Sequence, residues 1–418
     1  MKEKRVQANT AIPTARSDRA LEILFALAIP LHGVHSPIPA ITYGEMALML
    51  VAVLALFRMD WEHVTVKKPL IHMIVLYVLF VLLSGVVLLF RTDYDLTAIA
   101  VRVIRWSFYV FAAALLSATV DYTFVRRLVI RLAVFFSVVL IVQFFANLFF
   151  GKVLMLHMGQ NSIGAALEGI YKNGVLQKRI WRFSSFFSEP AHFSYYCNLG
   201  LALLVFYRDS LKFKMVELAC VSIMVLAVFL CSSTYGISLL AVQLGWFFWK
   251  YAQYRGKNPV VVLALFLFVL VGLRLFSRTS LADYLLYKFH TISQRERFQF
   301  AWQFLHNQNW TDRLLGVGIG NEEFYFRYHA NHSNVYLNSV SLTYLYCGWL
   351  GIALVVLFFF LQLFDEPSGN PLLMVMFLVI SLFSTAFYSP TMILFTVLFA
   401  GSVETPMWCG RKLGGAVT

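Results

Sequence analysis

The sequence predicts an all-α, polytopic membrane protein in which about 12 transmembrane helices form one domain over residues 1–418. Three observations lead to this fold class. Of the residues, 60% are hydrophobic and only 13% are charged, whereas a soluble domain averages roughly 25% charged residues. Apolar runs such as residues 70–90 and 259–276 are long, and a helix needs about 20 apolar residues to cross a bilayer. Lysines and arginines cluster in the short connections between these runs.

The apolar runs and their polar flanks define the expected helices. We expect them at residues 20–34, 41–57, 69–90, 97–119, 124–150, 190–207, 215–232, 235–250, 259–276, 334–361, 371–387 and 391–404. The first and last of these are short for a full span. An even number of crossings places both termini on the same side of the membrane.

The basic clusters give the orientation. They comprise the N-terminal tail and the clusters at 58–68, 126–131, 208–214, 250–257 and 411–412, all on alternate connections. The positive-inside rule assigns these connections, and both termini, to the cytoplasm. The opposite connections HGVHSPIPA and CSSTYG contain no lysine or arginine. The net charge of +13 therefore reflects membrane topology, and we expect no nucleic-acid partner.

Two long hydrophilic stretches fall on the outer side, at residues 151–189 and 277–333. All other connections are short. Loops of this length in a compact body usually carry function, so we expect the chemistry of the protein at its outer face.

The first long loop ends in RIWRFSSFFSEPAHFSYY and enters a helix at Pro190. Proline favours the first helical turn, and Ser188 and Glu189 suit its cap. Glu189 and His192 would then lie near Arg182 at the membrane surface, where the group could bind an anion and move a proton. The alternative is a capped helix surrounded by an interfacial aromatic belt.

The second long loop contains SQRERFQFAW, LLGVGIGNEEF and HANHSNVYLN. Arg295 and Arg297 supply two guanidinium groups, which match phosphate oxygens. Gly318 and Gly320 allow backbone amides to approach a ligand closely. His332 stands at a helix entrance, where it could act as a base. A lone glycine-rich turn and a hydrogen-bonded histidine are the alternatives.

The helix expected at 97–119 carries Arg102 and Arg105, which are three residues apart and so share one face. Both fall in the outer half of the membrane. An arginine costs about 2.5–3.5 kcal/mol at mid-membrane on translocon scales, so we interpret the pair as an anion site lining a cavity. The alternative is that both side chains snorkel to the interface.

A metal site is the competing interpretation of the outer face. Asp93 and Asp95 form a D-x-D pattern on the outer side, as in metal-dependent glycosyltransferases, but two acids at this spacing occur often by chance. We therefore expect no metal and no cofactor.

Taken together, these segments resemble the O-antigen polymerase and ligase superfamily. RFSSFFSEPAHFSYY is similar to the R-F-x-G-x-F-x-E-P-S-x-F-A signature of Wzy-type and related capsule polymerases, with Ser185 where glycine is frequent and Ala191 where serine is frequent. The order Arg297, Trp302, GVGIGN, His332-Ser-Asn-x-Tyr-Leu and Cys-Gly-Trp-Leu-Gly is similar to the family order R…W…GxGxG…HNxYL…GxxG. The match covers the C-terminal two-thirds of the chain in motif order.

The resemblance implies a GT-C-like glycosyltransferase of the bacterial inner membrane that uses undecaprenyl-diphosphate-linked glycans and polymerises their repeat units on the periplasmic face. It also implies a polysaccharide chain-length regulator as a candidate partner. We expect Arg102, Arg105, Arg182, Arg295, Arg297, His192, Gly318 and Gly320 to bind diphosphate or sugar, with Arg297 also catalytic, and Glu189 and His332 to activate the acceptor hydroxyl. Two alternatives remain open: an O-antigen ligase that transfers polymer to lipid A-core, and a transporter or flippase of lipid-linked sugars or a small anion.

Overall fold

The computed structural model describes residues 19–38, 41–59, 66–91, 94–158, 161–172, 175–207, 214–255, 309–322, 326, 337–364 and 371–402. Within these ranges the chain forms 12 α-helices. They are α1 (Ala20–Ala28), α2 (Tyr43–Arg58), α3 (Lys68–Leu89), α4 (Leu96–Thr119), α5 (Tyr122–Phe150), α6 (Pro190–Phe206), α7 (Met215–Leu230), α8 (Thr234–Arg255), α13 (Trp310–Leu315), α15 (Ser339–Phe364), α16 (Pro371–Phe383) and α17 (Thr391–Ser402).

Eleven of the described helices correspond to expected ones in order and closely in position, whereas α13 lies in the second long loop, where no helix was expected. Four of them, α3, α4, α5 and α15, are long and apolar enough to cross a membrane, as a helical membrane protein requires. The first expected helix ends early, at Ala28, and the helix expected at 371–387 gives way to a 3₁₀ turn, η3, at Ala386–Tyr388. The helix expected at 259–276 lies outside the described residues.

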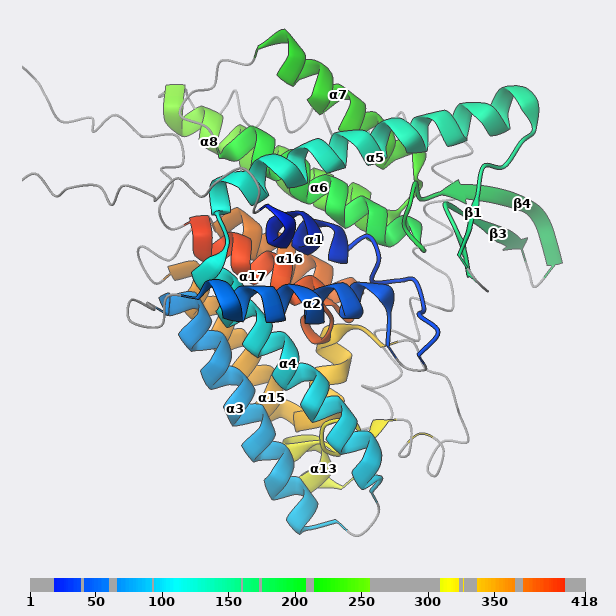
Figure 1. Ribbon diagram of the computed structural model, residues 1–418. Helices are drawn as coiled ribbons and strands as arrows, with labels where there is room; N and C mark the ends of the chain where they lie inside the picture. Colours follow the sequence, from blue (N-terminus) through cyan, green and yellow to red (C-terminus); the bar gives the residue numbers. More distant parts are fainter. Residues whose placement is uncertain are drawn as a thin grey trace, which may run out of the picture.

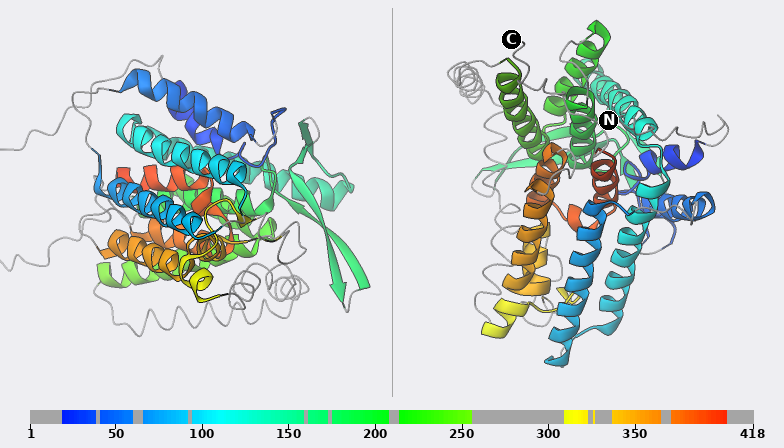
Figure 2. Two further views of the ribbon diagram at one scale, coloured as in Figure 1. Left: turned by 90° about the horizontal axis from the view of Figure 1, so that it is seen from below. Right: turned by 90° about the vertical axis from the view of Figure 1, so that its left-hand side faces the viewer.

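The helices form two groups that meet along α16 and α17. Helices α3, α4 and α15 run side by side, with α13 at one end (Figures 1 and 2). Helices α5, α6, α7 and α8 pack together, and α1 and α2 form an antiparallel pair against α4 and α5. Helix α17 contacts both α3 and α4, and α16 contacts α6 and α8. The buried side chains of α16 and α17 therefore join the groups into one core.

The first and last described helices meet the same end of the bundle. Arg19, just before α1, forms an ion pair of 2.8 Å with Asp121, which lies between α4 and α5. Gly401, near the end of α17, faces the ring of Tyr122. The start of α1 and the end of α17 therefore lie at the same end of the bundle.

Helix α15 is broken at Gly348, where φ is +58° and ψ is −152°. A break leaves helical carbonyl groups without their usual partners, and in a membrane such groups must be satisfied by protein. The turn at residues 316–318 supplies the donors. The backbone N–H groups of Val317 and Gly318 donate to the carbonyl oxygens of Leu345 and Tyr346, at 2.8 and 3.0 Å.

The first long loop contains β-structure that the sequence analysis missed. Strands β1 (Leu156–Met158) and β2 (Asn161–Ile163) form one antiparallel pair, and β3 (Ala165–Lys172) and β4 (Val175–Phe183) form another. The β3–β4 ribbon projects from the bundle near the C-terminal end of α5 (Figure 1). The protein is thus mostly helical, with a β-ribbon where only a loop was expected.

Candidate functional site

Segments far apart in the sequence converge on the N-terminal half of α4. The turn after α13 packs against the first two turns of α4, while the start of α2 lies against its third and fourth turns. The start of α6 lies in turn against the connection before α2. These contacts lie at the N-terminal end of α4. The Arg19–Asp121 pair lies at the opposite end of the bundle, because Asp121 follows the C-terminus of α4.

Arg102 is held by the second long loop. Its Nη2 atom lies 2.6 Å from Oε1 of Glu322, whose side chain is buried. Gly320 has a φ of +82°, and a Cβ there would lie 2.9 Å from the Cβ of Arg102. The backbone N–H of Asp95 donates to Oδ1 of Asn321 at 3.1 Å. The glycine therefore permits the close contact that places Glu322 on Arg102.

Arg105 is held by α2. Its Nε atom lies 3.3 Å from Oε1 of Glu45, and the hydroxyl of Tyr109 donates to the same carboxylate oxygen. The other oxygen accepts the backbone N–H of Thr42 at 2.8 Å in a capping box that starts α2. Glu45 thus performs two tasks: it caps its own helix and it neutralises Arg105 on the neighbouring one.

A pair of histidines continues this polar cluster toward α6. The ring centroids of His32 and His192 are 6.2 Å apart. Nδ1 of His32 is 3.5 Å from the hydroxyl of Thr42, and Nδ1 of His192 is 3.2 Å from that of Ser188. A Cβ at Gly33 would overlap the side chain of Ser188. The connection before α2 and the start of α6 are therefore in direct contact.

Helix α6 starts where it was predicted. Pro190 occupies the first turn and Glu189 is the N-cap residue, with extended φ and ψ of −136° and 145°, but its side chain makes no capping hydrogen bond. Its backbone carbonyl accepts the N–H groups of His192 and Phe193, and its side chain is exposed. The carboxylate is therefore accessible to solvent, and its role as a base stays a prediction.

Arg182 lies at the base of the β-ribbon. Its Nη2 atom donates to the carbonyl oxygen of Ser232 at 3.3 Å, in the connection between α7 and α8. The sequence analysis placed Arg182 beside Glu189 and His192. The structure places all three on one short segment, but it ties the guanidinium to the α7–α8 connection.

The glycine-rich turn has a packing role. Its successive N–H groups at Gly316, Val317, Gly318 and Ile319 donate to Asp312, Leu345, Tyr346 and the side-chain hydroxyl of Ser84, respectively. The amide of Gly318 is therefore engaged by α15. Binding of substrate by Gly318 and Gly320 stays a prediction.

Two carboxylates of the site were missed by sequence reasoning. Glu45 and Glu322 are each less than a tenth exposed, and each neutralises one arginine of α4. The signal for Glu45 was the Thr-x-x-Glu spacing of a capping box at residues 42–45. Glu322 stood within the quoted GNEEF segment, with nothing local to separate it from the glutamate beside it.

The α4 arginines remain accessible despite their partners. The side chains of Arg102 and Arg105 are 32% and 29% exposed. A guanidinium has five N–H donors, and the ion pair of Arg102 uses a single nitrogen. One turn along α4, the buried ring of Trp106 packs on the buried ring of Tyr388, with ring centroids 5.0 Å apart. The arrangement holds two oriented, partly exposed cations above an aromatic core, and guanidinium groups match phosphate oxygens.

The remaining candidates fall elsewhere. Arg295, Arg297 and His332 lie outside the described residues, as does Asp93 of the D-x-D pattern. Asp95 caps α4, since its Oδ1 accepts the N–H of Ala98 at 3.0 Å. Among the residues that the structure describes, no three His, Cys, Asp or Glu side chains form a group able to hold a metal ion.

Comparison with known proteins adds no family to this geometry. No protein-family model, no curated protein and no solved structure matches the chain.

Proposed function

We propose that the chain is a glycosyltransferase of the bacterial inner membrane that polymerises undecaprenyl-diphosphate-linked oligosaccharide repeats on the periplasmic face, yielding O-antigen or exopolysaccharide. One observation carries the proposal: both long hydrophilic segments reach the end of the bundle where the two arginines of α4 lie. Glu322 of the second segment bonds Arg102. The end of the first segment, at Ser188, lies against Gly33 in the connection that leads into α2, and Glu45 near the start of α2 bonds Arg105.

The reaction has a clear electrostatic requirement. The acceptor hydroxyl oxygen attacks the anomeric carbon of the donor sugar, and the bond from that carbon to the diphosphate oxygen breaks. The diphosphate leaves with the electron pair, so negative charge develops on it. Arg102 and Arg105 are fixed by their carboxylates before substrate arrives, and oriented cations of this kind stabilise developing charge at little reorganisation cost. The hydroxyl proton passes to Glu189 or His332.

The backbone at Ser185 supports the resemblance on which the polymerase assignment rests. Ser185 has a φ of +57°, in the left-handed region that favours glycine. It stands where glycine is frequent in the family signature. A glycine would therefore fit the backbone at this position without strain, as the family signature would have it.

The transporter alternative gains one observation. Helix α15 is broken at Gly348 beside the site, and broken helices occur at the substrate sites of transporters. Those transporters carry such breaks in corresponding positions of two repeats. In the described part of the chain, α15 is the one helix with an interior residue of non-helical conformation, so we retain the enzyme as the proposal.

The test is a gel of surface polysaccharide from a strain that lacks the chain and is complemented with variants. Arg102→Lys keeps the charge and loses the guanidinium fork. Arg58→Lys is the matched control, because Arg58 pairs with buried Glu22 in α1. Both variants should be expressed at the wild-type level. We expect wild type and Arg58→Lys to restore the ladder and Arg102→Lys to leave core carrying a single repeat.

Other results would overturn the polymerase. Bare core with polymer accumulating on undecaprenyl diphosphate in the strain without the chain would establish a ligase. Lipid-linked repeats retained on the cytoplasmic leaflet of that strain would establish a flippase.

A further inference from the structure

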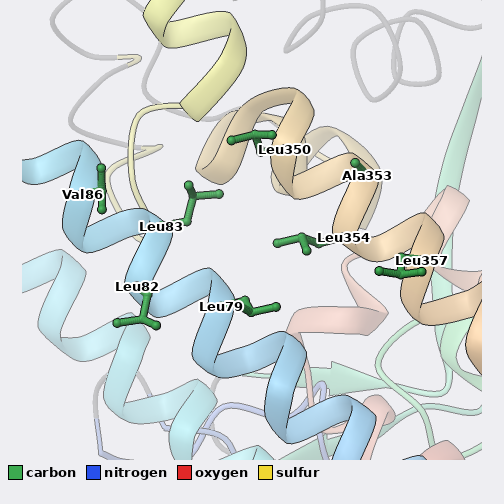
Figure 3. Close-up of a pocket in the computed structure, with 8 residues that line it drawn as sticks. All are labelled: Leu79, Leu82, Leu83, Val86, Leu350, Ala353, Leu354 and Leu357. Atoms are coloured by element: carbon green, nitrogen blue, oxygen red, sulfur yellow. The ribbon is translucent and has the colours of Figure 1, made fainter.

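An apolar groove runs between α3 and α15 on the surface of the helical bundle, with a volume of about 450 Å³. On the α3 side it is lined by Leu79, Leu82, Leu83 and Val86. Their spacing of three, four and seven residues defines a single stripe on one helical face. Figure 3 shows Leu79 and Leu83 directed into the gap toward α15.

Helix α15 presents a matching stripe. Leu350, Ala353, Leu354 and Leu357 repeat the same spacing and line the other wall. Every residue lining the groove is leucine, valine or alanine. Such a surface offers no hydrogen bond to a ligand, so it suits a hydrocarbon chain and excludes a sugar or a phosphate.

The groove is open along its length. The side chains of Leu82, Leu357 and Leu79 are 60%, 50% and 39% exposed. Both helices are long and apolar enough to span a membrane. In a bilayer the groove therefore opens to the hydrocarbon core, and a lipid chain can enter it sideways.

The groove adjoins the glycine-rich turn that reaches the arginine site. The N–H of Ile319 donates to Oγ of Ser84 in α3 at 2.7 Å, and the N–H of Val317 donates to Leu345 in α15 at 2.8 Å. The turn thus sits between the two helices, at the end of the groove lined by Val86 and Leu350. On its other side Gly320 contacts Arg102. A lipid with its tail in the groove has its headgroup beside this turn.

We propose that the α3–α15 groove holds the polyprenyl chain of the lipid-linked substrate, so that the turn at residues 316–320 separates the tail from the diphosphate at Arg102. This inference rests on the proposed function. An ordinary phospholipid would fill the apolar gap equally well, but its binding would have no connection with the arginine site.

The test uses the full chain in nanodiscs with a polyprenyl diphosphate that carries a photoreactive diazirine in its isoprenoid tail. Leu82→Trp and Leu354→Trp fill the groove from its two walls. Leu148→Trp on α5 is the matched control, because Leu148 is 60% exposed, as Leu82 is. We expect labelling to map to α3 and α15, to be competed by unlabelled polyprenyl diphosphate, and to be lost in both groove variants but not in the control.

The outcomes separate this inference from the proposed function. Labelling of the groove by a diazirine phospholipid to the same extent, without competition by polyprenyl diphosphate, would overturn the inference. The inference would also be overturned if Leu82→Trp and Leu354→Trp both extended the glycan fully and were labelled as strongly as wild type. The proposed polymerase would be unaffected by that result. Competed labelling of the groove in a chain that extends no glycan would support the lipid site and refute the polymerase.

Discussion

Nε of Arg105 and Oε1 of Glu45 are 3.3 Å apart, and this ion pair joins α4 to α2 at the candidate site. A second pair, Arg58 with Glu22, joins α2 to α1 at the other end of the same helix, at 3.4 Å. The two glutamate side chains are 6% and 5% exposed, and the two arginines 29% and 27%. The chain therefore contains two nearly identical ion pairs, only one of which lies at the site.

These pairs separate stability from function. Glu45→Gln and Glu22→Gln each remove the carboxylate charge from the ion pair of a partly buried arginine, and breaking a buried pair costs about 3–5 kcal/mol. Partial exposure of the arginines places the expected loss at or below the lower end of that range. We expect both variants to lower the thermal unfolding temperature in detergent by similar amounts, but only Glu45→Gln to abolish polysaccharide extension.

If Glu45→Gln and Glu22→Gln were expressed at the same level and extended polysaccharide to the same degree, Arg105 and Glu45 would have a purely structural role. The amide oxygen introduced by Glu45→Gln can still accept the bond from the backbone N–H of Thr42, so the start of α2 should be retained in this variant. Circular dichroism at about 222 nm, which reports helix content, checks that the helices are unchanged.

Ser185→Gly should stabilise the protein. Ser185 has a φ of +57°, and its buried hydroxyl has no hydrogen-bond partner among the described residues. Glycine removes both penalties, and a non-glycine residue in the left-handed region costs about 1–2 kcal/mol. Gln143 binds the backbone N–H and carbonyl of residue 185, so the turn survives the substitution. We expect a higher unfolding temperature and unchanged polymer length.

The neighbouring serine provides the control. The hydroxyl of Ser184 donates to the carbonyl oxygen of Phe187 at 2.8 Å, so Ser184→Gly should destabilise the protein. Ser185→Ala separates the two causes, because it removes the hydroxyl and keeps the strained backbone. A loss of stability in Ser185→Gly would show that the left-handed backbone is not strained.

Sequence reasoning was most successful where a signal was local. Pro190 marked the start of α6, and apolar length marked α3 and α5. Arg102 and Arg105 were found because an arginine inside an apolar run is costly. Their partners Glu322 and Glu45 were missed because they lie 220 and 60 residues, respectively, from the arginines they bind. Pairings at that separation depend on helix packing, which no local pattern encodes.

The β-ribbon was missed for another reason. Strands β3 and β4, AALEGIYK and VLQKRIWRF, carry no clear alternation of polar and apolar residues. A two-stranded ribbon has no second layer to bury one face, so its sequence needs no period of two. The break in α15 was visible only as a glycine in Cys-Gly-Trp-Leu-Gly, and glycine alone does not predict a break in a transmembrane helix.

Asp121 should make stability depend on pH at the end of the bundle remote from the site. Burial raises the pKa of its carboxyl, but the hydrogen bonds from Arg19 and from the N–H of Phe124 outweigh burial, and the net pKa is lowered. A carboxyl whose pKa is lowered by folding contributes stability above its unfolded pKa and loses it as pH falls through the folded value.

Asp121→Asn tests this contribution, because asparagine is as good an N-cap as aspartate. We expect a slightly lower unfolding temperature at about pH 7, since the carboxyl is 40% exposed and its ion pair is screened. The difference from wild type should shrink as the pH falls below about 4, the ordinary pKa of aspartate, and vanish once the folded carboxyl has taken up its proton at its lower pKa. A difference that is constant across this range would contradict a role for the charge.

The last prediction concerns the break in α15. Gly348 has φ and ψ of +58° and −152°, a combination that essentially only glycine adopts and that costs other residues about 1–3 kcal/mol. A Cβ there would also lie 2.6 Å from the carbonyl oxygen of Arg313. Gly348→Ala should therefore displace α13 and the turn that binds Leu345 and Tyr346, lowering both the unfolding temperature and polymer extension. Gly85→Ala in α3 is the control, because its Cβ would meet no atom of the described chain within 4 Å and alanine favours the helix. Equal stability of the two variants would show that the break in α15 does not need glycine, and that the turn can hold Glu322 on Arg102 without it.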